Sequence, residues 1–269
     1  MKKYFKLILT GLLIVGLMIA VVGCGGEEPA ASSNEDTNEQ QADSNEKKVY
    51  IVGTEPTFPP FEMTDDQGNI TGFDIDLIKA IAEEEGFEVE IKKLGFDGLI
   101  MALQSGNIDI AASGMSITPK RLESVDFSDP YIDAGLKIAV TADNNEIKSK
   151  EDLKGKVAAV QIGTTGAEKA YELKEEGLLK EVKTFKTVDI VFMELLNGGA
   201  DCVINDVPVT EAYMSKNEGK IKMVGEPLVG DQYGIAVAKG NSELLEKINS
   251  GLKKVKESGK YDELIKKYF

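Results

Sequence analysis

Histidine is absent from this chain of 269 residues, and cysteine occurs only twice. Histidine is the commonest general base and a frequent metal ligand near neutral pH, so its absence removes most hydrolase sites that depend on it. The sequence also shows no nucleophile motif and no cluster of metal-ligating residues. We therefore expect no catalytic residues, no metal site and no cofactor.

Positive charge is scarce as well. The chain has 31 lysine and arginine residues against 46 aspartate and glutamate residues, which gives a formal net charge of −15. Nucleic acids and anionic lipid surfaces attract basic proteins. The acidic balance therefore argues against nucleic acid as a partner and against a domain that binds a lipid surface.

The first 23 residues have the pattern of a signal peptide. A short basic stretch with three lysines precedes an almost unbroken apolar run over residues 7–22. Small Gly23 directly precedes Cys24, an order that resembles a bacterial lipobox, in which the cysteine is lipidated and becomes the mature N-terminus. The apolar run borders on membrane-spanning length, so a plain transmembrane anchor is the alternative. In either case we expect the rest of the chain to lie outside the cytoplasmic membrane.

Residues 24–47 have the composition of a tether. They contain seven acidic residues, mixed with serine, asparagine, glutamine and alanine, and no periodic apolar residues. Such a segment cannot bury enough apolar surface to offset its ordering entropy, so we expect disorder. The second cysteine, Cys202, stands in the apolar run 201–204. It is expected to be a small buried hydrophobe, without a disulfide partner if Cys24 is acylated.

From residue 48 onward, strand-like and helix-like patterns alternate, which is typical of an α/β fold. The predicted strands cover 48–53, 88–92, 108–112, 137–141, 156–160, 181–185, 201–204, 221–224 and 233–238. The predicted helices cover 72–85, 97–104 with Asp97 as its cap, a short helix after Thr118, 166–176, 190–196, 208–216 and 242–269. Residues 55–60, with three prolines, are expected to be a loop. This order predicts two α/β lobes, with a ligand at the carboxyl ends of strands between them.

The segment from Ser113 to Tyr131 is the most informative candidate site. Thr118 has the pattern of a helix N-cap with proline at the first helical position, and Arg121 follows one turn inside. Its planar fork of donors suits a carboxylate, and Ser116 with the amides around Gly114 could complete an anion cradle. The alternative is a surface arginine paired with Glu123 or Asp126.

Two further loops follow predicted strands of the second half. Gln161–Gly166 places glycines and the hydroxyls of Thr164 and Thr165 before a helix, which suits an anion site; the alternative is an ordinary capped turn. Asp206 stands at the end of a buried strand, where it could bind an ammonium group. Its alternative role is to cap the next helix.

Three residues of the first half complete the candidates. Glu55 and Phe58 follow the first strand, and Phe96 precedes Asp97. The phenyl rings could flank an apolar stem or make a cation–π contact, or they could simply be part of the core. Glu55 and Asp206 could also be catalytic carboxylates, but no other feature of a catalytic site accompanies them.

Taken together, these blocks resemble the polar amino-acid-binding proteins of ABC importers, solute-binding protein family 3. The resemblance covers nearly the whole body, and it is strongest to glutamine-binding and basic-amino-acid-binding lipoproteins of Gram-positive bacteria. Its blocks are Val52–Glu55 with Phe58, Pro60–Glu62, Gly72–Asp76, Phe96–Ile100, Ser113–Tyr131, Gly163–Thr165, Asp206 and Tyr233–Ala236.

The resemblance implies a periplasmic-binding-protein-like fold of type II. Lobe 1 would comprise 48–131 and 234–269, lobe 2 would comprise 137–228, and the hinge segments would lie at about 132–136 and 229–233. The protein would be a monomer without enzymatic activity, anchored by a lipid on Cys24 at the outer face of the cytoplasmic membrane. It would capture a free polar amino acid by lobe closure and deliver it to the membrane permease of an ABC transporter.

The resemblance also implies a role for each candidate residue. Arg121 would hold the α-carboxylate of the ligand with Ser116 and the Thr165 amide, while Thr164 belongs to the same turn. Asp206 and the Gly114 carbonyl would take the α-ammonium group. The ligand-binding set is completed by Phe58 and Phe96 beside the aliphatic stem, and by Glu55 and Gln161 near its distal end.

The identity of the amino acid stays open between two classes. Glu55 could receive a side-chain amide or a cationic head group. Gln161 stands where glutamine-binding relatives often have a lysine, which makes the pocket more acidic and favours lysine, arginine or histidine. The blocks after residue 120 are most similar to the glutamine-binding group, so glutamine is slightly favoured.

Two other classes of protein share this fold. One is an enzyme: some relatives on this fold are dehydratases, which would turn over prephenate or arogenate, and others carry a transglycosylase domain. With the chain ending at Phe269, a fused catalytic module of the second kind is not expected. The other is a sensor or receptor ectodomain, which would need transmembrane or kinase segments that we do not find in the sequence.

Overall fold

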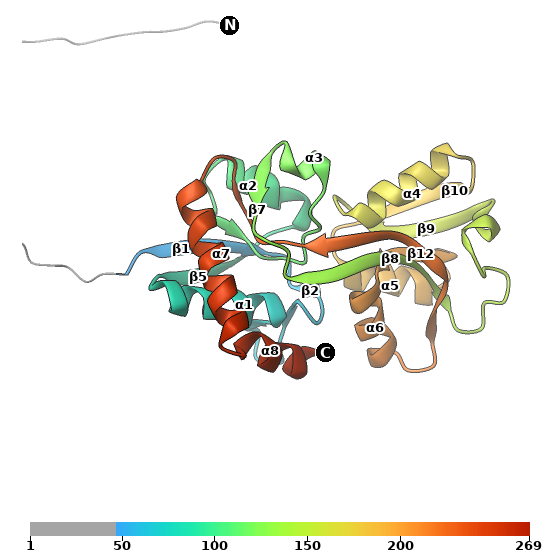
Figure 1. Cartoon of the computed structure of the whole chain (residues 1–269). Coiled ribbons are helices and arrows are strands. Elements are labelled where there is room, and N and C mark those ends of the chain that lie inside the picture. The colour runs from blue at the N-terminus through green and yellow to red at the C-terminus, as the bar shows by residue number, and fades with distance from the viewer. Residues whose placement is uncertain (1–46) are drawn as a thin grey trace, which may run out of the picture. The chain divides into compact units, whose positions relative to one another are not determined.

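The computed structural model describes residues 47–269, which belong to one compact unit, Asn45–Phe269. The predicted signal peptide (1–23), the lipidation site Cys24 and all but the last residue of the predicted tether (24–47) lie outside the described residues. Two five-stranded sheets with helices around them make up the described part (Figure 1). The predicted α/β class with two lobes is therefore confirmed. None of the helices described in residues 47–269 is both long and apolar enough to cross a membrane.

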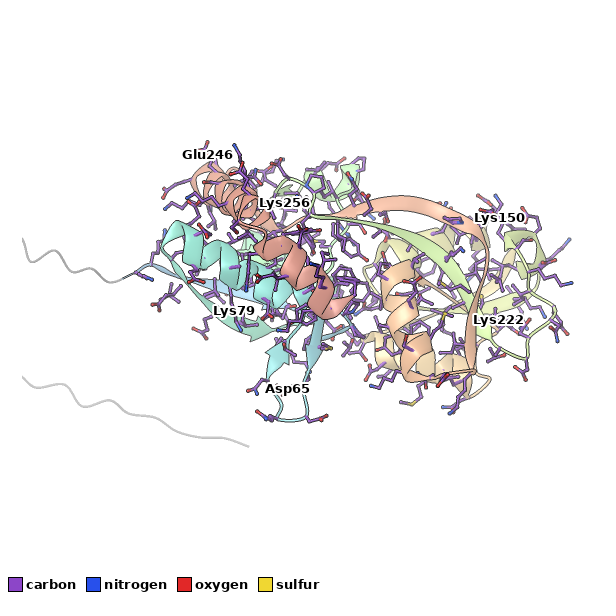
Figure 2. The ribbon with its side chains drawn as sticks, turned by 60° about the horizontal axis from the view of Figure 1, so that its bottom comes forward. Asp65, Lys79, Lys150, Lys222, Glu246 and Lys256 are labelled. Carbon is purple, nitrogen blue, oxygen red and sulfur yellow. The ribbon has the colours of Figure 1, made fainter. Side chains whose placement is uncertain are left out.

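The first lobe is built on a sheet with the strand order β5-β1-β6-β13-β7. Strand β1 pairs in parallel with β5 and β6, and β13 pairs antiparallel with β6 and β7. A small three-stranded sheet adjoins it, and Figure 2 shows Asp65 at the tip of its β3–β4 hairpin. The strands are β1 (Val49–Thr54), β2 (Thr57–Phe58), β3 (Glu62–Thr64), β4 (Ile70–Thr71), β5 (Glu88–Lys93), β6 (Ile110–Ala111), β7 (Val125–Phe127) and β13 (Ala236–Ala238).

Helix α1 of the first lobe forms where the sequence pattern places it. Helix α1 buries Leu77, Ile78 and Ile81, spaced to lie on one face, and ends at Gly86 in a left-handed conformation. It packs side by side with α7 (Figure 1). The helices are α1 (Phe73–Glu85), the 3₁₀ turn η1 (Phe96–Gly98), α2 (Leu99–Gln104), α3 (Pro119–Leu122), α7 (Ser242–Glu257) and α8 (Lys260–Tyr268).

The second lobe has the strand order β10-β9-β11-β8-β12. Strand β9 pairs in parallel with β10 and β11, and β8 pairs antiparallel with β11 and β12. Cys202 on β11 is fully buried in the core of this lobe, as expected for a small hydrophobe. The elements are β8 (Ile132–Thr141), η2 (Lys150–Leu153), β9 (Lys156–Gln161), α4 (Thr165–Glu175), β10 (Leu179–Phe185), α5 (Val188–Leu196), β11 (Cys202–Asp206), α6 (Val207–Lys216) and β12 (Ile221–Tyr233).

Strands β8 and β12 connect the two lobes (Figure 1). They pair from Ile132 with Tyr233 to Thr141 with Ile221, with one irregularity between Val224 and Val229. The strand predicted over 221–224 is therefore present and begins at Ile221, but it continues to Tyr233, so its predicted length was wrong. Cross-strand hydrogen bonds extend β12 through a stretch whose own composition, with glycine and proline, does not favour a strand.

Several local predictions also need correction. The predicted helix 242–269 is two helices, because Gly259 adopts a left-handed conformation (φ 80°) between α7 and α8. Asp97 does not cap α2; it lies inside the turn η1, and its carboxylate pairs with Lys186 at 2.8 Å. The predicted loop over 55–60 contains the short strand β2, and the strand predicted over 233–238 is broken before β13.

Candidate functional site

Arg121 is a buried arginine on the short helix α3. Thr118 is the N-cap, as predicted, and its hydroxyl accepts a hydrogen bond from the Arg121 N–H at 3.2 Å. The side chain is only 8% exposed, and burial lowers the pKa of its guanidinium. Nη1 donates to the Ser116 carbonyl at 2.8 Å, and Nη2 donates to the Gly163 carbonyl of the second lobe at 3.1 Å.

No carboxylate in residues 47–269 forms an ion pair with Arg121. Asp126 instead pairs with Lys239 at 2.7 Å, and Glu123 is exposed to solvent. The alternative of a surface ion pair is therefore wrong. A guanidinium has five donors, and the two carbonyls leave most of them available to a further acceptor.

Asp206 ends the buried strand β11 and faces the same region from the second lobe. It occupies the N-cap position of α6, but its side chain makes no capping hydrogen bond, so the capping alternative is not what its carboxylate does. Its exposure is 3%, and Oδ1 has no hydrogen-bond donor among the described residues. Burial raises the pKa of Asp206 to about 7, although the nearby Tyr233 hydroxyl and the Arg121 charge oppose this rise. A cation placed here would restore the ionised form.

The turn after strand β9 is both a capped turn and a contact with the first lobe. The Thr164 hydroxyl accepts from the Ala167 N–H at 3.1 Å and donates to the Gln161 carbonyl at 2.8 Å, so it caps α4. The Thr165 hydroxyl lies 3.5 Å from that of Ser116. The first amides of a helix have no partners within it, so the start of α4, next to the Gly163 carbonyl that accepts from Arg121, is where N–H donors for an anion are expected.

Glu55 and Gln161 meet across the two lobes. Glu55 is 2% exposed, and its Oε2 accepts hydrogen bonds from the Thr57 hydroxyl at 2.6 Å and from Gln161 Nε2 at 3.1 Å. Its other oxygen, Oε1, is buried without a donor among the described residues. Burial raises the pKa of Glu55, and the hydrogen bonds from Thr57 and Gln161 oppose this rise; the charges of Asp189 and Lys93 act in opposite directions.

The two phenylalanines lie in different surroundings. Phe58 is buried against Phe61 and Tyr233, so the core alternative applies to it in part. Its ring also lies against the Gly114 backbone, because a Cβ built on Gly114 would fall 2.6 Å from it. Phe96 lies under the Arg121 guanidinium, 5.3 Å from ring centroid to Cζ. The cation–π contact predicted for this ring is therefore made by an arginine of the chain itself.

The structure thus brings most of the predicted site residues together. Glu55, Ser116 and Arg121 of the first lobe each contact the second lobe directly, through Gln161, Thr165 and Gly163. Asp206 is close enough to Arg121 for the two charges to affect each other's pKa. Thr164 is the exception, since its described hydrogen bonds all stay within its own turn.

Sequence reasoning missed two residues that lie among these. The Thr57 hydroxyl, besides donating to Glu55, accepts from the Val188 N–H at the start of α5 at 3.0 Å, so it joins the lobes. Tyr233 is fully buried, and burial raises the pKa of its hydroxyl well above the usual value. Nothing in the sequence marks Thr57, whereas Tyr233 belongs to a block that carried the resemblance.

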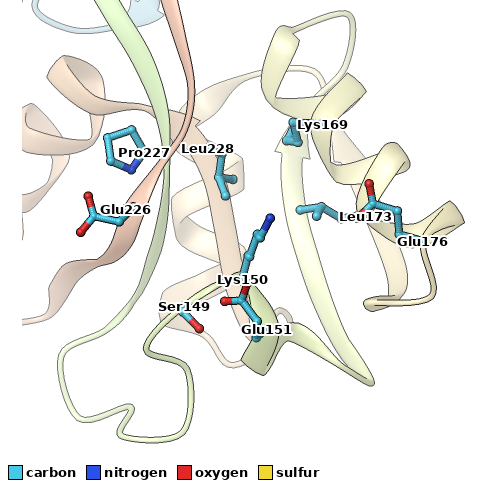
Figure 3. Close-up of a pocket in the computed structure, with 9 residues that line it drawn as sticks. All are labelled: Ser149, Lys150, Glu151, Lys169, Leu173, Glu176, Glu226, Pro227 and Leu228. Carbon is cyan, nitrogen blue, oxygen red and sulfur yellow. The ribbon is translucent and has the colours of Figure 1, made fainter.

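Other features of the surface lie apart from this site. A pocket of about 360 Å³ in the second lobe is lined by residues of η2, α4 and the bend in β12, including Lys150, Leu173 and Leu228 (Figure 3). None of the predicted site residues lines it. Within residues 47–269 no group of three or more aspartate, glutamate, histidine or cysteine side chains is arranged to hold a metal ion.

Curated relatives match the chain over nearly its full length. An arginine-binding extracellular protein of Bacillus subtilis is 34% identical over 270 residues, covering 100% of this chain and 98% of the relative. A glutamine-binding protein of an ABC transporter from the same organism is 35% identical over 273 residues, covering 100% and 97%. A probable histidine-binding protein of Neisseria gonorrhoeae is 36% identical over 255 residues, covering 93% and 91%.

Solved structures of amino-acid-binding proteins also match the chain. An ancestral arginine-binding protein bound to arginine is 48% identical with a TM-score of 0.79, covering 83% of this chain and 99% of its own. An ancestral arginine-binding protein bound to glutamine is also 48% identical, with a TM-score of 0.78 and the same coverage. An ancestral amino-acid-binding protein described as a precursor of cyclohexadienyl dehydratase is 43% identical, with a TM-score of 0.75 and coverage of 82% and 95%. The family model for bacterial extracellular solute-binding proteins, family 3, matches residues 50–269, and the chain belongs to that family.

Proposed function

We propose that this chain is the extracytoplasmic substrate-binding component of an ABC importer and that it captures a free amino acid between its two lobes. The observation that carries the proposal is the pair of buried groups Arg121 and Asp206. Each has the charge that one end of an amino-acid zwitterion requires, and neither forms an ion pair among residues 47–269. The arginine would bind the α-carboxylate, and the aspartate, with the Gly114 carbonyl, would bind the α-ammonium group.

The proposed mechanism is lobe closure without covalent chemistry. Lobe 1 (48–131 with 234–269) carries Arg121, and lobe 2 (137–228) carries Asp206, so a zwitterion that contacts both favours the closed form. The paired segments 132–136 and 229–233 would serve as the hinge. The related proteins described above are substrate-binding proteins, which supports binding rather than a dehydratase activity. The closed monomer would then dock onto the membrane permease.

For the ligand we propose a basic amino acid, with arginine as the best fit. The buried Oε1 of Glu55 lacks a donor among residues 47–269, and although the charges of Asp189 and Lys93 act on the pKa of Glu55 in opposite directions, no ion pair in this range neutralises its carboxylate. A cationic head group would supply donors and neutralise that charge together. Glutamine, slightly favoured by the sequence, could donate a neutral amide N–H to the same oxygen but would leave the charge uncompensated, so it is the second candidate.

Replacing Arg121 by alanine tests the carboxylate site. The variant should bind L-arginine and L-glutamine about 100-fold more weakly or worse in calorimetry, because a buried charged contact is lost. Lys120→Ala is the matched control: its exposed ion pair with Glu168 also crosses between the lobes, and its loss should change the binding free energy by less than about 1 kcal/mol. Normal affinity in folded Arg121→Ala protein would contradict the proposed role.

The titration of Asp206 gives a pH dependence. Its pKa is about 7 because of burial. An α-ammonium partner needs the ionised carboxylate, so the affinity should fall by up to about tenfold per pH unit as the pH drops below 7. Asp206→Asn should weaken binding at pH 8 by about 2–5 kcal/mol and lose this part of the pH dependence. A constant affinity of the parent protein between pH 5 and 8 would contradict the role of Asp206 as partner of the α-ammonium group.

The choice between arginine and glutamine rests on Glu55 and can be tested there. In a thermal-shift screen of the twenty amino acids, a tight ligand at about 100 times its Kd adds about 2.7 kcal/mol of stability, and arginine should give the largest shift. Glu55→Gln should reduce the preference for arginine over glutamine. Glu168→Gln removes an exposed carboxylate whose charge acts on Arg121, and it should leave the preference for arginine over glutamine unchanged. A parent protein that prefers glutamine would contradict the cationic ligand.

We also propose that Cys24 carries the lipid anchor, although that residue lies outside the described part of the chain. Cys24→Ser should release the protein from the membrane fraction of a Gram-positive host into the medium, because a lipid-anchored protein without its lipid loses its membrane attachment. Amino-acid binding should be unaffected, as calorimetry on the released protein would show. A variant that stays in the membrane fraction would indicate the alternative, a transmembrane anchor.

A further inference from the structure

Two carboxyl groups outside the predicted ligand contacts lie directly behind the loop Ser113–Gly114. Glu62 is 0% exposed and Asp74 is 1% exposed. In the part of the chain that the structure describes, neither forms an ion pair with a lysine or arginine; the ion pair on α1 nearest in sequence joins Asp76 to Lys267. Buried carboxyls without a cation are costly, so their protonation states need an explanation.

One oxygen of each carboxyl holds the loop in place. The Ser113 hydroxyl donates to Glu62 Oε1 at 3.0 Å and itself accepts from the Glu55 N–H at 3.0 Å. The Gly114 N–H donates to Asp74 Oδ2 at 2.7 Å, and the Tyr131 hydroxyl donates to the same oxygen at 2.7 Å. The two remaining oxygens, Glu62 Oε2 and Asp74 Oδ1, are buried and receive no donor from any described residue.

The two side chains interact with each other through a hydrogen bond, which raises the pKa of Glu62 and lowers that of Asp74, and such a bond between two carboxyls requires one proton. Asp74 accepts two strong hydrogen bonds, which favour its ionised form, whereas Glu62 accepts only one from a neutral hydroxyl. Burial, followed by the negative charge of Asp74, raises the pKa of Glu62 well above its ordinary value. Burial raises the pKa of Asp74 to about 6, and the hydrogen bonds from Gly114 and Tyr131 limit this rise. The hydrogen bonds and the directions of the two pKa shifts therefore both favour the proton on Glu62.

Among residues 47–269, no titratable group that acts on the pair would reverse this assignment. The titratable groups that act on the pair are Glu55, on the segment after β1, and the buried hydroxyls of Tyr131 and Tyr233. Glu55 is acidic, and a second negative charge disfavours ionisation of Glu62. The tyrosines are neutral, because burial raises the pKa of both well above the usual value.

We propose that Glu62 is a protonated acid that donates to Asp74, and that this carboxyl pair positions Gly114 for the ligand ammonium group. The positioning part rests on the proposed function; the protonation part does not. Gly114 has a left-handed backbone (φ 48°), and Phe58 closely covers the place where a side chain would start. The hydrogen bond from its N–H to Asp74 holds the residue whose carbonyl faces the ammonium in the proposed complex.

Infrared spectroscopy of the full chain tests the protonation directly. At pH 8 the parent should show the carbonyl stretch of a protonated carboxylic acid, and Glu62→Gln should lack it. Asp206→Asn is the matched control and should keep the band. An absent band in the parent, or a band that survives in Glu62→Gln, would overturn the assignment to Glu62.

The pH dependence of the free energy of unfolding gives a second test. A purely structural role of Glu62, without a change in its pKa on folding, would not alter this pH dependence. Unfolded Glu62 ionises above its ordinary pKa of about 4.5, so unfolding of the parent releases a proton and becomes easier as the pH rises toward the raised pKa of the folded state. Above about pH 4.5, and until the pH reaches the raised pKa of folded Glu62, the unfolding equilibrium constant of the parent should therefore rise up to about tenfold more per pH unit than that of Glu62→Gln. Equal slopes would overturn the proposal.

Ligand titration tests the positioning role. Asp74→Asn protein that is folded by circular dichroism should bind L-arginine about tenfold more weakly or worse, because the Gly114 N–H loses a charged acceptor. Parent-like affinity would overturn the positioning role. If the parent itself binds no amino acid, the proposed function and the positioning role fail together, while the infrared band and the unfolding slope still decide the protonation of Glu62.

Discussion

The buried guanidinium of Arg121 is the group around which the site is organised. Removing its charge from water is costly, and the described contacts that offset this cost are two carbonyl dipoles and the face of an aromatic ring. None of these neutralises the charge. Because one carbonyl belongs to Gly163, the arginine also ties the first lobe to the second. A carboxylate ligand fits this environment because it supplies the missing negative charge at the junction of the lobes.

Carboxyl groups outnumber this arginine in the interior. The buried charged residues of the described chain are Arg121 and four acids, namely Glu55, Glu62, Asp74 and Asp206. A proton on Glu62 removes one negative charge, and the ammonium and carboxylate of any amino acid cancel each other. The remaining excess is negative, and a cationic side chain near Glu55 reduces it, whereas an amide does not. This charge balance is the physical reason for preferring a basic ligand.

Much of the fold could be predicted from the sequence because the signals are local. Thr118 with Pro119, and the apolar face of α1 ending at Gly86, specify their elements within a few residues, and both are confirmed. The length of β12 could not be predicted, since it depends on pairing with β8 about ninety residues earlier in the chain. The break at Gly259 is a single left-handed glycine inside an otherwise helical pattern, which local propensity tolerates in either state.

The candidate site was predictable to the extent that its residues follow strands. Asp206 and Gln161 end parallel strands of one sheet, so the alternating pattern alone places them at the same edge. Glu62 and Thr57 lie in the segment of the three-stranded sheet, and their partners are distant in sequence. Their contacts depend on tertiary packing between distant segments, which the spacing of residues along the sequence does not predict.

Contacts between the lobes and contacts to a ligand use different atoms. Arg121 commits one donor to Ser116 and one to Gly163, and its planar fork has five, so a carboxylate can bind without releasing the second lobe. Glu55 accepts hydrogen bonds from Thr57 and Gln161 at Oε2, while its Oε1 has no donor among the described residues and is available to the head group of the proposed ligand. Closure and ligand binding therefore do not compete for the same hydrogen bonds. A ligand that fills the open positions would add its binding energy to the contacts that already join the lobes, as the proposed capture by lobe closure requires.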